Sequence, residues 1–243
     1  MRRLALLAGA LALVAGPAAA QILPPDLAAS LGEGSLAGRA VQLFLLVTVL
    51  GLVPGLLLMA TCFPFIVTVL SILRQGIGLQ QAPPNMLIVS LALFLTWFVM
   101  DPVLTEAWTK GIEPLTAGLI TPEQAIPAAL APFRAFMAGR LNPETLTALQ
   151  ALRPGTVAVA PPDAPLSLLV PSFILSEIQR AFEIGFLVYL PFLIIDLVTS
   201  AVLMSMGMMM VSPAVVSLPF KLAFFVVADG WTLISGALVR SYM

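Results

Sequence analysis

The chain has 243 residues, of which 60% are hydrophobic and only 9% are charged, and its mean hydropathy is +1.07. A water-soluble domain needs far more charge to cover its surface, so this composition excludes an ordinary soluble protein. The net charge of −1 argues against nucleic acid as a partner, because no basic patch is available to neutralise phosphates. We therefore expect an all-α integral membrane protein whose surface is covered by lipid or by other subunits.

The first 20 residues have the pattern of a cleavable secretory signal. Arg2 and Arg3 precede an apolar stretch, and small residues come just before Gln21. A short first membrane helix is the alternative, but the apolar stretch falls short of the roughly 20 residues that a span needs. We expect a signal peptide over residues 1–20, which places the start of the mature chain outside the cytoplasm.

Residues 21–108 are predicted to form a polar lead and the first of two kinked hydrophobic helical hairpins. The apolar run at 43–73 is too long for one straight helix, and we expect Pro54 and Pro64 to break it. After a loop rich in glycine and proline, a second apolar segment is expected to end at Asp101, which a proline follows.

Residues 109–167 are polar and rich in proline, and they are predicted to form a small helical insert between the hairpins. Thr121 and Gln124 have the spacing of a capping box, which predicts a helix through about Gly139. Asn142, followed by a proline, predicts a second short helix. If the mature chain starts outside the cytoplasm, this insert is periplasmic, since long polar loops are translocated largely regardless of their charge.

Residues 168–243 are nearly all apolar and are predicted to form the second hydrophobic hairpin. We expect Pro191, Pro213 and Pro219 to divide this region. The chain then contains four hydrophobic segments, and it shows no internal repeat strong enough to indicate an inverted-repeat transporter.

The residue types that most catalytic sites require are missing. There is no histidine, so no imidazole is available as a base or as a metal ligand. The single cysteine, Cys62, has no second cysteine to pair with and is expected to serve packing. The sequence also lacks the Gly-x-Ser-x-Gly elbow of hydrolases and the phosphate-binding loop of ATPases. We therefore expect no enzymatic activity, no cofactor and no metal site.

Several charged residues lie inside the hydrophobic segments, where a charge is costly unless it is paired. They are Glu177, Arg180, Glu183, Asp196, Lys221 and Asp229. Arg180 lies three residues from both Glu177 and Glu183, so either pair can form on a helix surface. We expect Lys221 to pair with Glu177 of a neighbouring copy. A proton or ion relay is the alternative, but relays usually contain histidines or clustered unpaired acids.

The segment 204–210, MSMGMMM, contains five of the chain's 11 methionines. Its methionines would surround a helix instead of forming one stripe, and Gly207 together with Pro213 favours a helix end that turns into a loop. Flexible methionine side chains from several subunits could close a pore and still part around an unfolded chain. Ordinary lipid-facing side chains are the alternative interpretation.

Three stretches of the sequence carry a family resemblance: residues 63–85, 91–102 and 171–231. The third is the most specific and includes SEIQRAFEIGF, MSMGMMMVSPA and LPFKLAFFVVADGW. Together they resemble the FliP family, the flagellar members of a group of type III export-gate subunits whose injectisome counterparts are the SctR proteins. The signal peptide and the large polar insert are similar to the flagellar branch.

The resemblance implies a pore-forming subunit of the flagellar export gate, which passes unfolded flagellar subunits across the inner membrane and is needed for flagellum assembly. It implies several copies, five by the family pattern, assembled with FliQ and FliR and lying beside FlhA, FlhB and the basal-body ring. The implied location is the bacterial inner membrane within the flagellar basal body, with substantial mass on the periplasmic side. A stand-alone secondary transporter or ion channel is the alternative function.

The resemblance also assigns roles to individual residues. It implies a gasket that closes the pore, formed by Met208, Met209 and Met210, with Met204 and Met206 beside them. The residues that it places at subunit contacts, or that lie next to those positions, are Glu177, Arg180, Glu183, Lys221 and Phe136.

Overall fold

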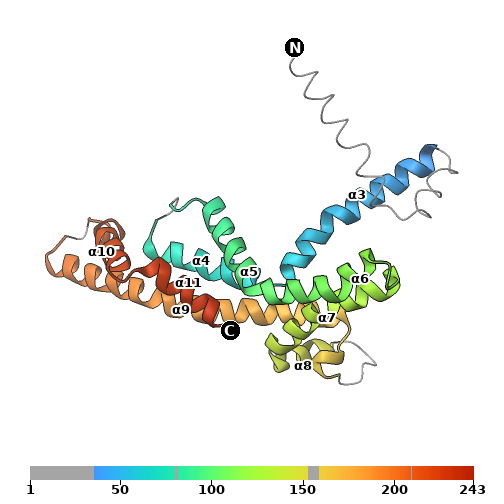
Figure 1. Ribbon diagram of the computed structural model, residues 1–243. Helices are drawn as coiled ribbons and strands as arrows, with labels where there is room; N and C mark the ends of the chain where they lie inside the picture. The colour runs from blue at the N-terminus through green and yellow to red at the C-terminus, as the bar shows by residue number, and fades with distance from the viewer. Residues whose placement is uncertain (1–35, 80–81, 153–158, 209) are drawn as a thin grey trace, which may run out of the picture. The chain divides into compact units, whose positions relative to one another are not determined.

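The computed structural model describes residues 36–79, 82–152, 159–208 and 210–243, and the regular structure in these ranges is helical (Figure 1). The chain divides into two compact units, Met1–Gly55 and Leu56–Met243. The predicted signal peptide at residues 1–20 lies outside the described residues.

Helix α3, Leu36–Met59, is the described part of the first unit and continues into the start of the second. Its stretch Ala40–Met59 has a mean hydropathy of 2.4 and is long enough to cross a membrane. The prediction that Pro54 breaks this run is wrong, because α3 continues through it. An interior proline removes one backbone hydrogen bond, a loss that long apolar helices of membrane proteins tolerate. The break at Pro64 is confirmed, since this proline lies in the first turn of the next helix.

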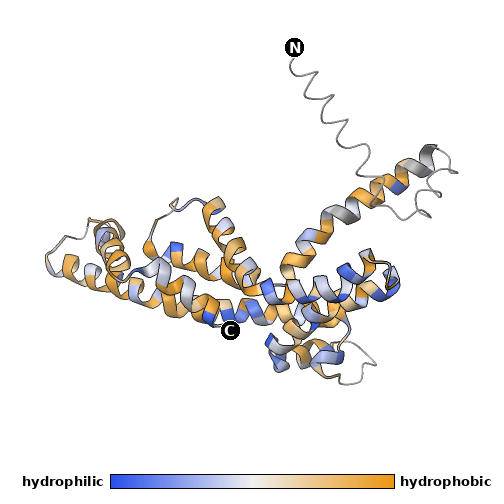
Figure 2. Cartoon of the chain, viewed as in Figure 1, coloured by the Kyte–Doolittle hydropathy of each residue, from blue (hydrophilic) through white to orange (hydrophobic). Residues whose placement is uncertain are grey.

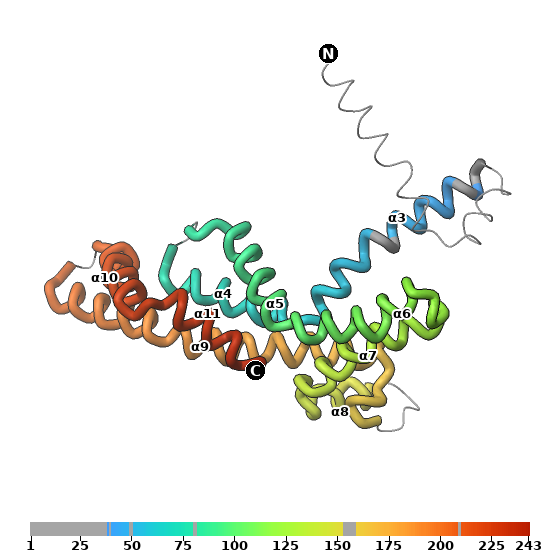
Figure 3. The backbone as a smooth tube through the Cα atoms, in the orientation of Figure 1, coloured from blue at the N-terminus to red at the C-terminus, as the bar shows by residue number. Residues whose placement is uncertain are grey.

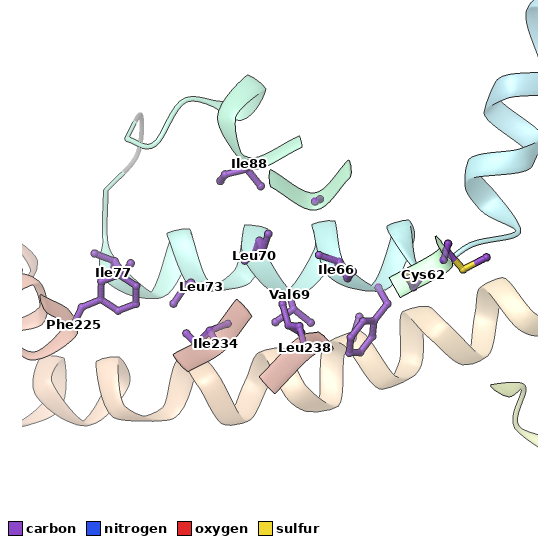
Figure 4. Packing of buried hydrophobic residues seen from close by; sticks show 14 of the residues in the cluster. Cys62, Ile66, Val69, Leu70, Leu73, Ile77, Ile88, Phe225, Ile234 and Leu238 are labelled. Atoms are coloured by element: carbon purple, nitrogen blue, oxygen red, sulfur yellow. The ribbon is translucent and has the colours of Figure 1, made fainter. Parts of the chain in front are cut away.

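Helix α4, Phe63–Ile77, lies at the centre of the second unit. It packs against α5, Asn85–Ala107, and along α9, Leu166–Ser205. Figure 4 shows side chains from both faces of α4 reaching into the core, toward Ile88 on one side and toward Ile234 and Leu238 on the other. Full burial of one large aliphatic side chain contributes about 1.5–3 kcal/mol, so this short helix is a main source of stability.

Helix α9 is a single helix of 40 residues. We predicted that Pro191 would divide this region, and that prediction is wrong, because both Pro171 and Pro191 lie inside the helix. Its packing against α4 is close at Gly185, where an added Cβ would lie 2.4 Å from Cδ1 of Ile72. Only a residue without a side chain fits at this crossing without displacing Ile72.

Helix α5 also continues past an expected end. We predicted a stop at Asp101, but the helix runs through Pro102 to Ala107 and leads into a five-residue π-helix, Trp108–Ile112, and then into α6, Glu113–Thr116. As in α3 and α9, a proline that was expected to end an apolar helix lies inside it, because apolar surroundings favour continued backbone hydrogen bonding.

The helices of the polar insert agree with the sequence. Helix α7, Pro122–Arg140, begins with the predicted capping box of Thr121 and Gln124. Helix α8, Pro143–Ala151, begins where the Asn142 side chain accepts a hydrogen bond from the backbone N–H of Glu144, at 2.9 Å. The two helices bury a second apolar cluster against the first turns of α9, so the insert is packed onto this long helix.

Helices α10, Pro213–Val227, and α11, Gly230–Arg240, complete the unit and are bent by 61° relative to each other. The expected break at Pro213 is confirmed, because α10 begins there, whereas Pro219 lies inside α10 and does not end it. Helix α10 packs against α9, and α11 follows it toward α4 and α5 (Figure 3).

The long helices consist largely of hydrophobic residues (Figure 2), and many of their large apolar side chains are exposed. Among the described residues, α3, the helical stretch from α5 through α6, and α9 are long and apolar enough to cross a membrane, and α10 with α11 makes a fourth span if the bent pair counts as one. The predicted all-α fold of an integral membrane protein is confirmed.

Candidate functional site

A buried ion cluster surrounds Glu177 of α9, whose side chain is completely inaccessible to solvent. Its Oε1 lies 3.7 Å from Nη1 of Arg180 and 3.7 Å from Nε of Arg140. Its Oε2 accepts a hydrogen bond from the hydroxyl of Tyr242. The predicted pairing of Glu177 with Arg180 is confirmed, and it forms part of a larger network that joins α7, α9 and the segment after α11.

The Arg140 side chain is held by this same segment. Its Nη1 donates a hydrogen bond of 2.7 Å to the backbone carbonyl of Ser241, and its guanidinium carbon lies 4.0 Å from the centroid of the Tyr242 ring. Such a cation–π contact is worth about 0.5–2 kcal/mol, with the larger value at desolvated sites. Burial raises the pKa of Tyr242, and the nearby negative charge of Glu177 raises it further, so the phenol remains a hydrogen-bond donor.

Sequence reasoning missed Arg140 and Tyr242 as partners of Glu177. The usable signal was the cost of a carboxylate in an apolar helix, which requires a counter-charge from elsewhere in the chain or from another subunit. Neither the helical spacing nor the composition identifies that partner, because Tyr242 lies 65 residues from Glu177.

Phe136 lies beside this cluster, inside an aromatic group of its own chain. Its ring centroid is 5.8 Å from that of Phe173 and 6.1 Å from that of Tyr242. The Tyr242 ring in turn meets Phe65 of α4 edge to face, at 5.4 Å. Edge-to-face and stacked rings are favourable arrangements, so Phe136 helps to hold α7 against α9.

Glu183 and Arg180 line a small polar notch on α9. The notch has a volume of about 80 Å³ and is also lined by Asn142, Ser176 and Gln179. The Glu183 carboxylate accepts a hydrogen bond of 3.0 Å from the Gln179 amide, whereas Arg180 is oriented toward Glu177. The expected pairing between Arg180 and Glu183 is therefore replaced by two separate interactions.

A second ion pair joins α9 to α10. Nζ of Lys221 lies 2.6 Å from Oδ2 of Asp196, and the Ser217 hydroxyl donates to Oδ1 of the same carboxylate, also at 2.6 Å. Lys221 is only 5% exposed. We expected Glu177 of a neighbouring copy as its partner, but its own chain supplies the counter-charge, so the lysine does not require another subunit to be neutralised.

The methionine-rich segment follows the end of α9, as predicted. The helix ends at Ser205, and Gly207 has a positive φ of 75° that turns the chain toward α10. The described methionine side chains are exposed, with 61% for Met204, 66% for Met206, 41% for Met208 and full exposure for Met210. Met209 lies outside the described residues. An apolar cavity of about 600 Å³ between α9 and α10 is lined in part by Met206 and Met208.

These arrangements do not resemble a catalytic centre. In the described ranges, no group of three or more His, Cys, Asp or Glu residues could hold a metal ion. Cys62 is fully buried, and burial raises the pKa of its thiol to about 12, so it stays protonated and poorly nucleophilic. The candidate sites are therefore the paired charges of α9 and the exposed methionines at its end.

The chain is similar in sequence to known proteins of one family. The FliP family model matches residues 46–238. The flagellar biosynthetic protein FliP of Agrobacterium fabrum is 45% identical over 229 residues, which cover 93% of this chain and 94% of that protein. The protein of the same name from Caulobacter vibrioides is 48% identical over 88% of this chain and 80% of that protein. The one from Bacillus subtilis is 42% identical over 83% of this chain and 91% of that protein. The chain belongs to the FliP family.

Proposed function

We propose that this chain is a pore-forming subunit of the flagellar type III export gate, through which unfolded flagellar subunits cross the inner membrane. Membership of the family makes it a component of the export apparatus that is needed for flagellum assembly, and a transport protein instead of an enzyme.

The observation that carries the pore assignment is the methionine-rich loop. The described side chains of residues 204–210 project from the end of α9 and are exposed in the subunit. Exposed methionines are unfavourable in water but can pack against each other or against many partners, because their side chains are flexible and polarizable. A ring of these loops, with Met208, Met209 and Met210 as its gasket, would block small ions and part around an unfolded chain.

The apolar surface of the subunit supports assembly with other membrane proteins. Large side chains such as Phe94, Trp97, Phe186 and Val227 are more than half exposed. Lipid covers part of this surface, and partner subunits cover the remainder. We infer several copies, five by the family pattern, together with FliQ and FliR and beside FlhA, FlhB and the basal-body ring.

We assign the charged residues of α9 and α10 either to the internal structure of the subunit or to its contacts with neighbours. Glu177 and Lys221 are paired inside the subunit, so we assign them to its internal geometry, on which correct assembly depends. Arg180 and Glu183 lie at the polar notch and offer hydrogen-bonding groups to a neighbouring subunit. Phe136 contributes through the packing of the insert.

We also infer where the chain is located and how it is oriented. Residues 1–20 act as the signal peptide, and the insert at 109–167 lies on the periplasmic side between the hairpins at 21–108 and 168–243. The subunit is located in the inner membrane within the flagellar basal body, with substantial mass on the periplasmic side.

The deciding experiment measures the mass of the complex recovered in mild detergent when this chain is expressed with and without its FliQ-like and FliR-like partners. A large mixed assembly that depends on those partners is the expected result. A monomer that is indifferent to the partners would overturn the proposal and favour a stand-alone transporter.

A further inference from the structure

The two residues after α11, Ser241 and Tyr242, close over the Glu177 carboxylate and are here named the clasp. The clasp supplies a hydroxyl to Glu177 and a backbone carbonyl to Arg140. We propose that closure of the clasp is required before the subunit can assemble, and that Tyr242 and Arg140 act as positioning residues for Glu177. This inference rests on the proposed function in the export gate.

Hydrogen bonding shows why the clasp matters to Glu177. Both arginines lie 3.7 Å from Oε1, beyond hydrogen-bond distance, and this buried oxygen has no hydrogen-bond partner among the described residues. The hydroxyl of Tyr242 is the one donor that the described residues supply to the carboxylate. A buried carboxylate that loses its only hydrogen bond is strongly disfavoured, because an open clasp leaves Glu177 with the longer contacts to the two arginines alone.

The clasp also connects helices that are far apart in the sequence. The Tyr242 ring contacts Phe65 of α4 and Phe136 of α7, while its hydroxyl reaches Glu177 of α9. Arg140 contacts both the ring of Tyr242 and the carboxylate of Glu177. One side chain therefore links the insert to α4 and α9, in addition to the apolar packing of the insert on α9, and we infer that this link helps to set the surface that a neighbouring subunit meets.

Cys62 provides a direct readout of closure. It is the chain's single cysteine, it is fully buried, and it belongs to the core cluster against which Tyr242 packs. Opening the clasp removes the ring from this cluster and admits reagents to the thiol. The rate at which a maleimide labels Cys62 in membranes therefore reports the population of open subunits.

The test compares three variants with the natural chain expressed without partners. Tyr242→Phe keeps the ring and removes the hydroxyl, and we expect labelling of Cys62 to accelerate by about tenfold, the effect of losing one hydrogen bond to a charged group. Tyr242→Ala also removes the ring contacts and should accelerate labelling further. Met243→Ala changes a neighbouring side chain that is 83% exposed, and it should leave the rate unchanged. Equal rates in all three variants would overturn the proposal.

A double variant tests whether Tyr242 acts through Glu177. In a Glu177→Gln background the acceptor is neutral, so adding Tyr242→Phe should accelerate labelling much less than it does in the natural chain. A purely structural role of Tyr242 in packing would instead give the same acceleration in both backgrounds, and that result would remove its positioning role.

The assembly requirement is measured by coexpression with the FliQ-like and FliR-like partners. We expect Tyr242→Ala to reach the membrane but to be lost from the large complex, with Tyr242→Phe intermediate and Met243→Ala normal. A Tyr242→Ala subunit that assembles fully would refute the requirement for closure. If the natural chain itself forms no complex, the export-gate function fails, while the labelling experiment still decides whether the clasp closes on Glu177.

Discussion

The two halves of α9 differ in how their functional side chains are exposed: the charged residue in the first half is buried, and the methionines at the end of the second half are exposed. In its first half, Glu177 is buried, and Arg140, Arg180 and Tyr242 contact its carboxylate. At its other end, the helix leads into methionines that are exposed to the surroundings. The chain therefore pairs the Glu177 charge internally and exposes apolar, flexible side chains at the end of the helix.

This contrast follows from the cost of each group. A buried charge that waits for another subunit would destabilise every unassembled copy by several kcal/mol. An exposed methionine costs far less, and the membrane or a neighbouring loop can cover it. The two regions thus predict different phenotypes, since changes near Glu177 should affect the isolated subunit and changes in the loop should affect only the assembled gate.

The largest effect is expected from Glu177→Ala. It leaves Arg140 and Arg180 close together without a counter-charge and removes the acceptor of Tyr242. We expect a loss of about 3–5 kcal/mol in the free energy of unfolding of the isolated subunit. Thermal unfolding in detergent measures this loss. Glu183→Ala, an exposed change on the same helix, is the control and should unfold like the natural protein; equal losses in both variants would remove the special role of the buried site.

The pair between Lys221 and Asp196 gives the next effect. Lys221→Glu places two carboxylates together and should cost about 3 kcal/mol, with reduced levels of subunit in the membrane. Adding Asp196→Lys should restore the level, because the pair is then reversed. Adding Glu177→Lys should not, and a rescue by that change instead would show that the lysine pairs between subunits. Lys110→Glu, at an exposed pair with Glu106, is the matched control.

A smaller loss is expected where α4 and α9 cross. Gly185→Ala would place a methyl group 2.4 Å from Ile72 and should destabilise the subunit by about 1–3 kcal/mol through overpacking. Gly139→Ala, where nothing lies within 4 Å of the added Cβ, should be neutral or stabilise α7 by up to about 1 kcal/mol. Chemical denaturation of the two variants measures the difference, and equal stabilities would refute the close crossing.

The smallest effect on stability is expected in the loop. Replacing Met208, Met209 and Met210 together by alanine should change the free energy of unfolding by less than about 0.5 kcal/mol and leave assembly intact. The assembled gate should nevertheless leak small ions, which a conductance measurement in reconstituted membranes detects. Val226→Ala with Val227→Ala, at another exposed apolar position, should not cause leakage. A tight gate in the methionine variant would contradict the gasket.

Local chemistry explains which helices could be predicted from the sequence. The starts of α7 and α8 were correct, because a capping box and an Asn cap act within three residues. The ends assigned to Pro54, Asp101 and Pro191 were wrong, because an apolar helix keeps its remaining hydrogen bonds across an interior proline. Prolines marked helix boundaries only where they lie in a first turn, as Pro64 and Pro213 do.

The charged sites show the same limit. The contact between Glu177 and Arg180 was predictable from their spacing on one helix. The partners Asp196 of Lys221 and Tyr242 of Glu177 lie 25 and 65 residues away, and only the tertiary packing brings them together. Sequence reasoning identified which residues need partners, while the fold determined which partners they have.

The ion pair between α9 and α10 also has a mechanical consequence for the loop. Asp196 lies ten residues before Met206, so the pair anchors the two helices about 15 Å from the tip of the hairpin. Between this anchor and the tip, the cavity of about 600 Å³ leaves one side of the hairpin loosely filled. The ion pair therefore holds the base of the hairpin in place, while the loosely filled side lets the tip move without disturbing the core.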